Sequence, residues 1–212
     1  MKKVFLSFFA LSAMYVASAQ ISVGLNTNYT MYKQEFQKNT PGVGIRVLYE
    51  VSEKQSAGLS FTYGMPIKYA SSTTIIHSST GNLENVPSEI KYNFKTINLM
   101  GNFTFIGNSE TTGKFYGSFG AGLVLVSYKE AITGNYDKTI YEAPEPFKGS
   151  ENGFTINLGI GGEYKLGTPS IFGEAGIAFP ANKVGDSYVQ NYIPTHLTMN
   201  LGIRLPLGGS DF

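Results

Sequence analysis

Five charged residues stand at positions where the surrounding segments otherwise carry small side chains: Arg46, Glu50, Glu163, Glu174 and Arg204. Apolar and small polar residues alternate in each of these segments, and the charges fall on the small-residue side of the alternation. A charge that is removed from water needs a partner, because an unpaired buried charge is strongly destabilising. Two interpretations follow, a site that handles protons or ions and a structural salt-bridge cluster. We favour the structural cluster.

A predicted hairpin brings two of the carboxylates together. Alternation runs through Phe154–Leu166, a Gly-Thr-Pro-Ser turn follows, and alternation then resumes at Ile171. If Leu166 pairs with Ile171, Glu163 lies opposite Glu174 on the polar face. Carboxylates that face each other repel, so a cation must reach them or one must hold a proton.

The arginines are the expected partners of these carboxylates. Arg204 lies in the last alternating segment, next to the hairpin in chain order, and we expect it to bridge to Glu174. Arg46 and Glu50 are expected to reach across a narrow interior. Replacing Arg204 by alanine should then cost about 3–5 kcal/mol of stability if the cluster is dry.

Other catalytic or metal chemistry has little support in the sequence. The two histidines, His77 and His196, are far apart, and neither has an evident carboxylate nearby to orient it. Cysteine is absent, which excludes disulfides, thiolate metal sites and cysteine nucleophiles. A net charge of +1 gives no general attraction for nucleic acid. We therefore predict no enzyme activity, no cofactor, no metal site and no nucleic-acid partner.

Eight segments with a period of two must position the charged residues. Such a period is typical of a strand with one apolar and one polar face. The segments are Gln20–Tyr32, Pro41–Val51, Ser56–Ile67, Glu89–Ile106, Lys114–Tyr128, Phe154–Leu166, Ile171–Phe179 and Thr195–Leu207. The alternation in Glu89–Ile106 slips near Lys95-Thr96, which predicts a bulge there. Pro66 has no N–H for a ladder, so we place it at a rim or bulge.

The connections between these segments follow a rhythm. Short turns alternate with long polar excursions, of which the longest are Lys68–Ser88, Lys129–Asn152 and Ala181–Pro194. Membrane β-barrels have short periplasmic turns and longer outer loops. The sequence therefore predicts an all-β protein, an eight-stranded antiparallel up-and-down transmembrane β-barrel.

The apolar side chains are expected to face lipid rather than a core. An eight-stranded interior has room only for side-chain filling, and the small polar set suits it better than the bulky apolar set. Leu59, Phe119, Leu158 and Leu201 should therefore lie on the outside. Aromatic residues near strand ends are expected to form the girdles at the membrane interfaces: Tyr49, Phe105, Phe115, Tyr128, Phe154, Tyr164 and Phe179.

The first nineteen residues have the layout of an export signal. Lys2 and Lys3 precede a mostly apolar stretch, and Ala17-Ser18-Ala19 forms a small-residue cleavage site before Gln20. We assign 1–19 to a signal peptide and 20–212 to the barrel domain.

At the level of the whole pattern, the chain resembles the OmpA/OmpX-like small outer-membrane β-barrels. The segment Thr96–Tyr128 is similar to the central hairpin of the outer-membrane β-barrel domain proteins common in Bacteroidetes. The resemblance implies insertion into the outer membrane of a Gram-negative bacterium, after periplasmic chaperone escort and with the barrel-assembly machinery. It also implies contact with outer-membrane lipids and lipopolysaccharide.

Three functions remain open from the sequence. The favoured one is a non-enzymatic structural or surface-interaction barrel whose exposed loops, above all Lys68–Ser88 and Lys129–Asn152, carry partner specificity. The second is a narrow pore or conduit for small hydrophobic solutes. The third is a lipid A-modifying enzyme, for which His77-Ser78 and His196-Leu197-Thr198 are the candidate residues.

Overall fold

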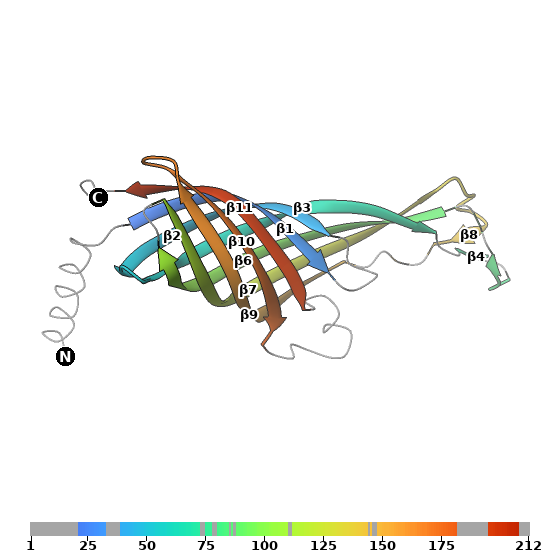
Figure 1. Ribbon diagram of the computed structural model, residues 1–212. Coiled ribbons are helices and arrows are strands. Elements are labelled where there is room, and N and C mark those ends of the chain that lie inside the picture. Colours follow the sequence, from blue (N-terminus) through green and yellow to red (C-terminus); the bar gives the residue numbers. More distant parts are fainter. Residues whose placement is uncertain are drawn as a thin grey trace, which may run out of the picture.

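Eight antiparallel strands close into a barrel with the order β1-β11-β10-β9-β7-β6-β3-β2 (Figure 1). The computed structural model describes residues 21–32, 39–72, 75–77, 80–84, 86, 88–109, 112–143, 145, 148–181 and 195–207. The barrel strands are β1 (Ile21–Tyr32), β2 (Thr40–Ser52), β3 (Gln55–Ser72), β6 (Ser88–Ser109), β7 (Gly113–Gly134), β9 (Lys148–Lys165), β10 (Ser170–Pro180) and β11 (His196–Leu207). The predicted fold class is confirmed.

Four of the strands are much longer than a membrane span requires. β3, β6, β7 and β9 contain 18, 22, 22 and 18 residues, whereas β1, β2, β10 and β11 contain 12, 13, 11 and 12. Because a tilted spanning strand needs about 9–11 residues, the long strands continue past the rim at which the short ones end. Figure 1 shows this extension on the side away from the first residues of β1 and the last residues of β11. We call residues 65–72, 88–95, 127–134 and 148–153 the protruding sheet.

The large apolar side chains point away from the barrel axis, as the alternation predicts. Leu59, Phe119, Leu158 and Leu201 are 63%, 43%, 48% and 62% exposed on the outer surface. The opposite phase of the same strands supplies small and polar residues, for example Ser56, Thr155 and Thr198, which are buried. Since about 2–4 kcal/mol is lost when a charge faces the bilayer centre, an apolar outside and a polar inside are the arrangement that lipid favours.

The β9–β10 hairpin has a register two residues away from the expected one. Ile171 pairs with Tyr164, not Leu166, so Glu163 lies opposite Phe172. The physical reason is the turn: Gly167 adopts a left-handed conformation (φ 91°), and the Leu166 N–H donates to the Pro169 carbonyl at 2.8 Å. The last pair before the turn is therefore Lys165 with Ser170, whereas Leu166 with Ile171 was predicted. Glu174 lies opposite Gly161, so the expected pair of facing carboxylates does not form.

The bulge predicted at Lys95-Thr96 lies on the partner strand. Gly64 pairs with Thr96 and Ile67 with Phe94, so the extra residue belongs to β3, next to Pro66. β6 itself keeps its phase, because its pairing with β7 is continuous from Ser88 to Ile106. The placement of Pro66 at a bulge is confirmed.

The long excursions after β3 and β7 are not simple loops. The two ends of Lys68–Ser88 and of Lys129–Asn152 belong to the protruding sheet. The two excursions also meet in a small sheet of β5 (Leu83–Glu84), β4 (Ile75–His77) and β8 (Tyr141–Glu142), in which β4 is central. Ile76 pairs with Glu142 and His77 with Tyr141, so the two segments hold each other.

Several sequence-based assignments lie outside the described residues. They are the signal peptide at 1–19 and nearly all of the third long loop, at 182–194. Within the described ranges, the chain contains no helix of sufficient length and hydropathy to span a membrane.

Candidate functional site

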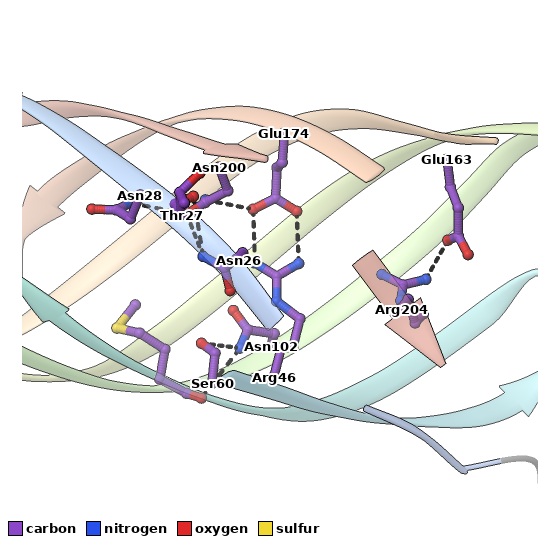
Figure 2. A network of polar contacts seen from close by, with 11 residues as sticks. Asn26, Thr27, Asn28, Arg46, Ser60, Asn102, Glu163, Glu174, Asn200 and Arg204 are labelled. Atoms are coloured by element: carbon purple, nitrogen blue, oxygen red, sulfur yellow. Dashed lines mark hydrogen bonds and ion pairs between the residues drawn. The ribbon is translucent and has the colours of Figure 1, made fainter. Parts of the chain in front are cut away.

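The lumen holds three layers of side chains. The inward-facing residues of β1 mark the height of each layer along the barrel axis. Gly24 lies at the level of a charged layer, Asn26 and Asn28 at the level of an amide layer, and Tyr32 at the level of an apolar layer at the rim. Because strand residues alternate between the faces of a sheet, these residues share the inward phase of β1. Figure 2 shows the first two layers from close by.

The charged layer is centred on a two-pronged ion pair that crosses the lumen from β2 to β10. The Arg46 Nη1 and Nη2 atoms donate to Glu174 Oε2 and Oε1 at 2.9 and 3.0 Å, and both side chains are buried (Figure 2). Asn200 Nδ2 adds a longer contact of 3.5 Å to Glu174 Oε1. This geometry is the strongest form of an arginine–carboxylate contact.

A second ion pair joins β11 to β9. The Arg204 guanidinium and the Ser170 hydroxyl both donate to the Glu163 carboxylate. The expected bridge from Arg204 to Glu174 is therefore wrong, and the cause is the register shift that moves Glu163 away from Glu174.

Glu50 takes part in a looser contact near the other end of β2. Its Oε1 atom lies 3.9 Å from Lys114 Nζ of β7. Each of the five sequence-predicted residues is thus in an ion pair, and Lys114 is the sixth member. Three cations face three carboxylates, so the layer is electrically balanced.

Phe172 fills the centre of the charged layer. Its ring is fully buried, with the Arg46 and Arg204 guanidinium carbons 5.7 and 5.2 Å from the ring centroid. Cation–aromatic contacts at such distances are attractive. The ring has room because it lies over glycine: a Cβ on Gly202 would lie 2.7 Å from Phe172 Cζ and 2.3 Å from the Leu25 carbonyl oxygen.

The amide layer lies above the charges. Asn26 and Asn28 Nδ2 atoms donate to Asn200 Oδ1 at 3.2 and 2.9 Å, and the Thr30 hydroxyl donates to Asn28 Oδ1 at 2.9 Å. On another part of the wall, Asn102 donates to the Ser60 hydroxyl at 2.8 Å. These groups border a polar cavity of about 50 Å³. A void of this size accommodates water molecules but no larger solute.

The apolar layer closes the lumen at the rim. Phe94, Val124 and Val126 are buried together, and Tyr32 and Tyr128 pack against them. The rings of Tyr32 and Phe94 meet edge to face with centroids 6.0 Å apart. The prediction that Tyr128 belongs to the outer aromatic girdle is wrong, because this residue has the inward phase of β7 and is part of the apolar layer.

The two histidines lie in different parts of the molecule. His196 is buried at the start of β11, with its ring centroid 5.3 Å from that of Tyr32. His77 lies on β4 in the small outer sheet. Among the described residues, no group of three or more His, Cys, Asp or Glu side chains is arranged to hold a metal ion.

Sequence reasoning missed Phe172 and Lys114. Phe172 carries a signal, since it is a large ring on the small-residue phase of Ile171–Phe179, within reach of glycines on neighbouring strands. Lys114 also has the inward phase, but a charged residue at the start of a predicted strand gives no sign of a partner inside the barrel.

Comparisons with known proteins concern the fold. No protein-family model matches the chain, and no curated protein matches its sequence. The structure is similar to that of a major outer membrane protein from Thermus thermophilus, with 12% identity, 90% of this chain and 100% of that chain covered, and a TM-score of 0.63. It is also similar to that of Neisserial surface protein A (NspA), with 10% identity, 88% of this chain and 96% of that chain covered, and a TM-score of 0.52. For the attachment invasion locus protein Ail of Yersinia pestis, the identity is 16%, 89% of this chain and 97% of that chain are covered, and the TM-score is 0.48.

Proposed function

We propose that this chain, which has the fold of the small eight-stranded outer-membrane β-barrels, is a non-enzymatic outer-membrane protein of a Gram-negative bacterium with a structural and surface-interaction role. Residues 1–19 direct its export, and periplasmic chaperones and the barrel-assembly machinery bring the remainder into the membrane. Outer-membrane lipids and lipopolysaccharide surround the apolar belt.

The protruding sheet carries this proposal. Beyond Gly64, β3 pairs only with β6, and before Thr155, β9 pairs only with β7, within the described part of the chain. The sheet therefore presents two open edges above the rim, along 65–72 and 148–153. An open edge offers unpaired backbone groups to an added strand, so we infer that an extended segment of a partner protein binds there by strand addition.

The layered lumen supports an interaction role over transport. An eight-stranded barrel has an interior that side chains can fill, and charges, amides and apolar groups fill successive levels of this one. The polar cavity between them measures about 50 Å³. A conduit for hydrophobic solutes would need a continuous apolar path, and the balanced charged layer is a barrier to such solutes.

Single cysteines test the proposed topology, because the natural sequence contains none. Ser150 lies exposed on the open edge of β9, and Ser52 lies exposed at the end of β2 near the opposite rim. In intact cells, a membrane-impermeant maleimide should label Ser150→Cys and should label Ser52→Cys only after permeabilisation. Labelling of both variants, or of Ser52→Cys alone, in intact cells would exclude the proposed orientation.

The Ser150→Cys variant also tests the interaction role. A photo-crosslinker attached at Ser150→Cys should give a discrete adduct on intact cells that is lost when proline replaces neighbouring edge residues. The same crosslinker at Asn135→Cys, which lies exposed directly after the inner strand β7 on the same side of the membrane, controls for reaction with abundant surface proteins. If the maleimide labelling is as expected but no specific adduct forms, the interaction role is contradicted and the structural role alone remains.

A further inference from the structure

Four lysines lie on the outer face of three adjacent strands, at and just above the rim. Their side chains have the same phase as the exposed apolar residues lower on these strands, Leu99 of β6, Leu125 of β7 and Phe154 of β9. They therefore leave the wall on the side of the lipid and not of the lumen. We call them the basic patch: Lys91 and Lys95 of β6, Lys129 of β7 and Lys148 of β9.

The strand register makes the basic patch compact. Lys129 lies directly opposite Lys148 on one side and opposite Asn93 on the other. Lys91 and Lys95 flank Asn93 on β6. Since neighbouring strands are about 4.8 Å apart and two residues span about 6.7 Å along a strand, the four side chains start within roughly 15 Å of one another.

Within the described part of the chain, no carboxylate forms an ion pair with these lysines. Among the described side chains, the ion pairs join Arg46 to Glu174, Lys114 to Glu50 and Arg204 to Glu163, and include none of the four. Like charges directly across a pair of strands are destabilising, so the Lys129–Lys148 pair weakens the sheet that carries it. Such an arrangement is explained by an anion outside the chain.

Lys95 has an aromatic contact, and among the described residues of β6, β7 and β9 the carboxylate that shares the outer face with the patch is Glu89. Lys95 Nζ lies 5.2 Å from the centroid of the Tyr63 ring, a contact that leaves its charge available. Glu89 shares the outward phase of β6, but it lies two residues beyond Lys91 and pairs with Thr133, farther from the rim. Glu130, next to Lys129, has the inward phase of β7. The net charge of the basic patch and its surroundings on the outer face is therefore positive.

The height of the patch fits the level of lipid headgroups. Lys95 is adjacent to Thr96, which pairs with Gly64 at the end of the β2–β3 ladder. The exposed apolar belt ends just below, at Leu125 and Phe154. Aromatic and basic side chains at the end of an apolar belt are typical of the membrane–water interface.

We propose that the basic patch binds the phosphate groups of the glycolipid in the outer leaflet, the lipid A phosphates of lipopolysaccharide. The inference rests on the proposed function, because it requires this rim to face the outer leaflet. A lysine ammonium is a suitable point charge for phosphate. Each lysine near an anionic membrane surface strengthens association by about fivefold, and four together select the phosphorylated lipid over neutral ones.

The test uses the chain from residue 20 onward, folded into bilayer nanodiscs of phosphatidylcholine with or without lipopolysaccharide. The variant Lys129→Gln/Lys148→Gln is compared with Lys54→Gln/Lys165→Gln, which removes the same charge from exposed positions near the opposite rim. Lipopolysaccharide should raise the thermal unfolding midpoint of the natural protein and of the control. The patch variant should lose most of that rise and bind lipopolysaccharide about thirtyfold more weakly, at about fivefold per lysine.

In bilayers without the glycolipid, we expect the two substitutions to change the thermal unfolding midpoint in the opposite direction. In phosphatidylcholine alone, Lys129→Gln/Lys148→Gln should unfold at the same or a higher temperature than the natural protein, because the facing charges are gone. A general defect in folding would lower the midpoint in both bilayers and is thereby distinguished.

Four results would overturn the proposal: an unchanged lipopolysaccharide response in the patch variant, an equal response of the natural protein to dephosphorylated lipopolysaccharide, full reproduction of the response by inorganic phosphate, or binding of a sulfated polysaccharide without binding of lipopolysaccharide. A natural protein that fails to enter either bilayer would instead contradict the proposed function.

Discussion

Close approach between strands makes a glycine indispensable at one point of the lumen wall. A methyl group on Gly202 would lie 2.3 Å from the Leu25 carbonyl oxygen and 2.7 Å from Asn26 Cβ and Phe172 Cζ. Two of these contacts involve groups that cannot move without distorting the barrel. We expect Gly202→Ala to cost about 1–3 kcal/mol, the usual range for overpacking, measured as a lower urea midpoint in detergent micelles.

Gly173 provides the matched control for this effect. It lies directly opposite Leu201, next to Gly202, and a Cβ there meets no atom within 4 Å. Gly173→Ala should leave the urea midpoint unchanged or raise it slightly. Equal losses in the two variants would mean that glycine acts in this wall through backbone freedom and not through the space it leaves for Phe172.

The buried Arg46–Glu174 pair and the partly buried Arg204–Glu163 pair should differ in their sensitivity to truncation. Arg46→Ala leaves the Glu174 carboxylate buried with only the 3.5 Å contact from Asn200, and breaking a buried pair in this way costs about 3–5 kcal/mol. After Arg204→Ala, Glu163 keeps the Ser170 hydroxyl, so a smaller loss is expected. The urea unfolding midpoints of the two variants in detergent micelles measure which substitution costs more stability.

A double replacement separates the value of the pair from the cost of an orphaned charge. Arg46→Ala/Glu174→Ala should be more stable than Arg46→Ala, because no carboxylate is then left without its partner. If the double variant is instead the less stable of the two, the Glu174 carboxylate has another strong partner and the charged layer is assembled differently.

At the level of elements, the small β5-β4-β8 sheet organises the two long excursions. Ile75 is fully buried in it, whereas Ile140, next to β8, is 41% exposed. Loss of a large buried apolar side chain costs about 2–5 kcal/mol, more than a sheet with strands of two and three residues can absorb. Ile75→Ser should therefore speed surface proteolysis within 73–87 and 135–147, while Ile140→Ser should not.

The barrel serves as the internal reference for that measurement. Since β4, β5 and β8 lie outside the closed barrel, the unfolding midpoint of the membrane-embedded part should be equal in both variants. A lower midpoint in Ile75→Ser would show that the small sheet and the barrel unfold together, contrary to this view.

Alternation in the sequence predicted the strands and the faces they expose, but it could not predict their register. A shift of two residues preserves which side chains face inward, so pairing Leu166 or Tyr164 with Ile171 satisfies the same pattern. The difference decides whether Glu163 faces Glu174 or Phe172. Five charged members of the layer stand out in the sequence, whereas Lys114 and Phe172 were missed. The partner of Glu163 depends on the geometry of one turn.

The protruding sheet was missed for a related reason. Above the rim the outer face is no longer covered by lipid tails, so nothing there requires an apolar phase. The hydrogen-bonded ladder between β6 and β7 nevertheless continues to the Ser88–Gly134 pair. Polar strands of this kind resemble loops in sequence, because a backbone ladder leaves no signature in side-chain polarity.

For the whole molecule, closure of the lumen rests on two layers of unlike chemistry. Charged pairs around Phe172 lie on one side of the amide layer, and the cluster of Phe94, Val124 and Val126 lies on the other. A hydrated ion meets a filled level at each of them. Because the layers come from different residues, removal of one leaves the other in place.

Planar-bilayer recordings test this view of the lumen. The natural protein, Arg46→Ala and Phe94→Ala should each show no single-channel steps, since at least one closed layer remains in each. Arg46→Ala/Phe94→Ala removes a large side chain from each layer, beside the polar cavity of about 50 Å³ that Arg46 helps to line, and small steps are expected from it alone. Steps from the natural protein would favour a pore, and steps from Arg46→Ala alone would show that the apolar layer at the rim does not seal the barrel.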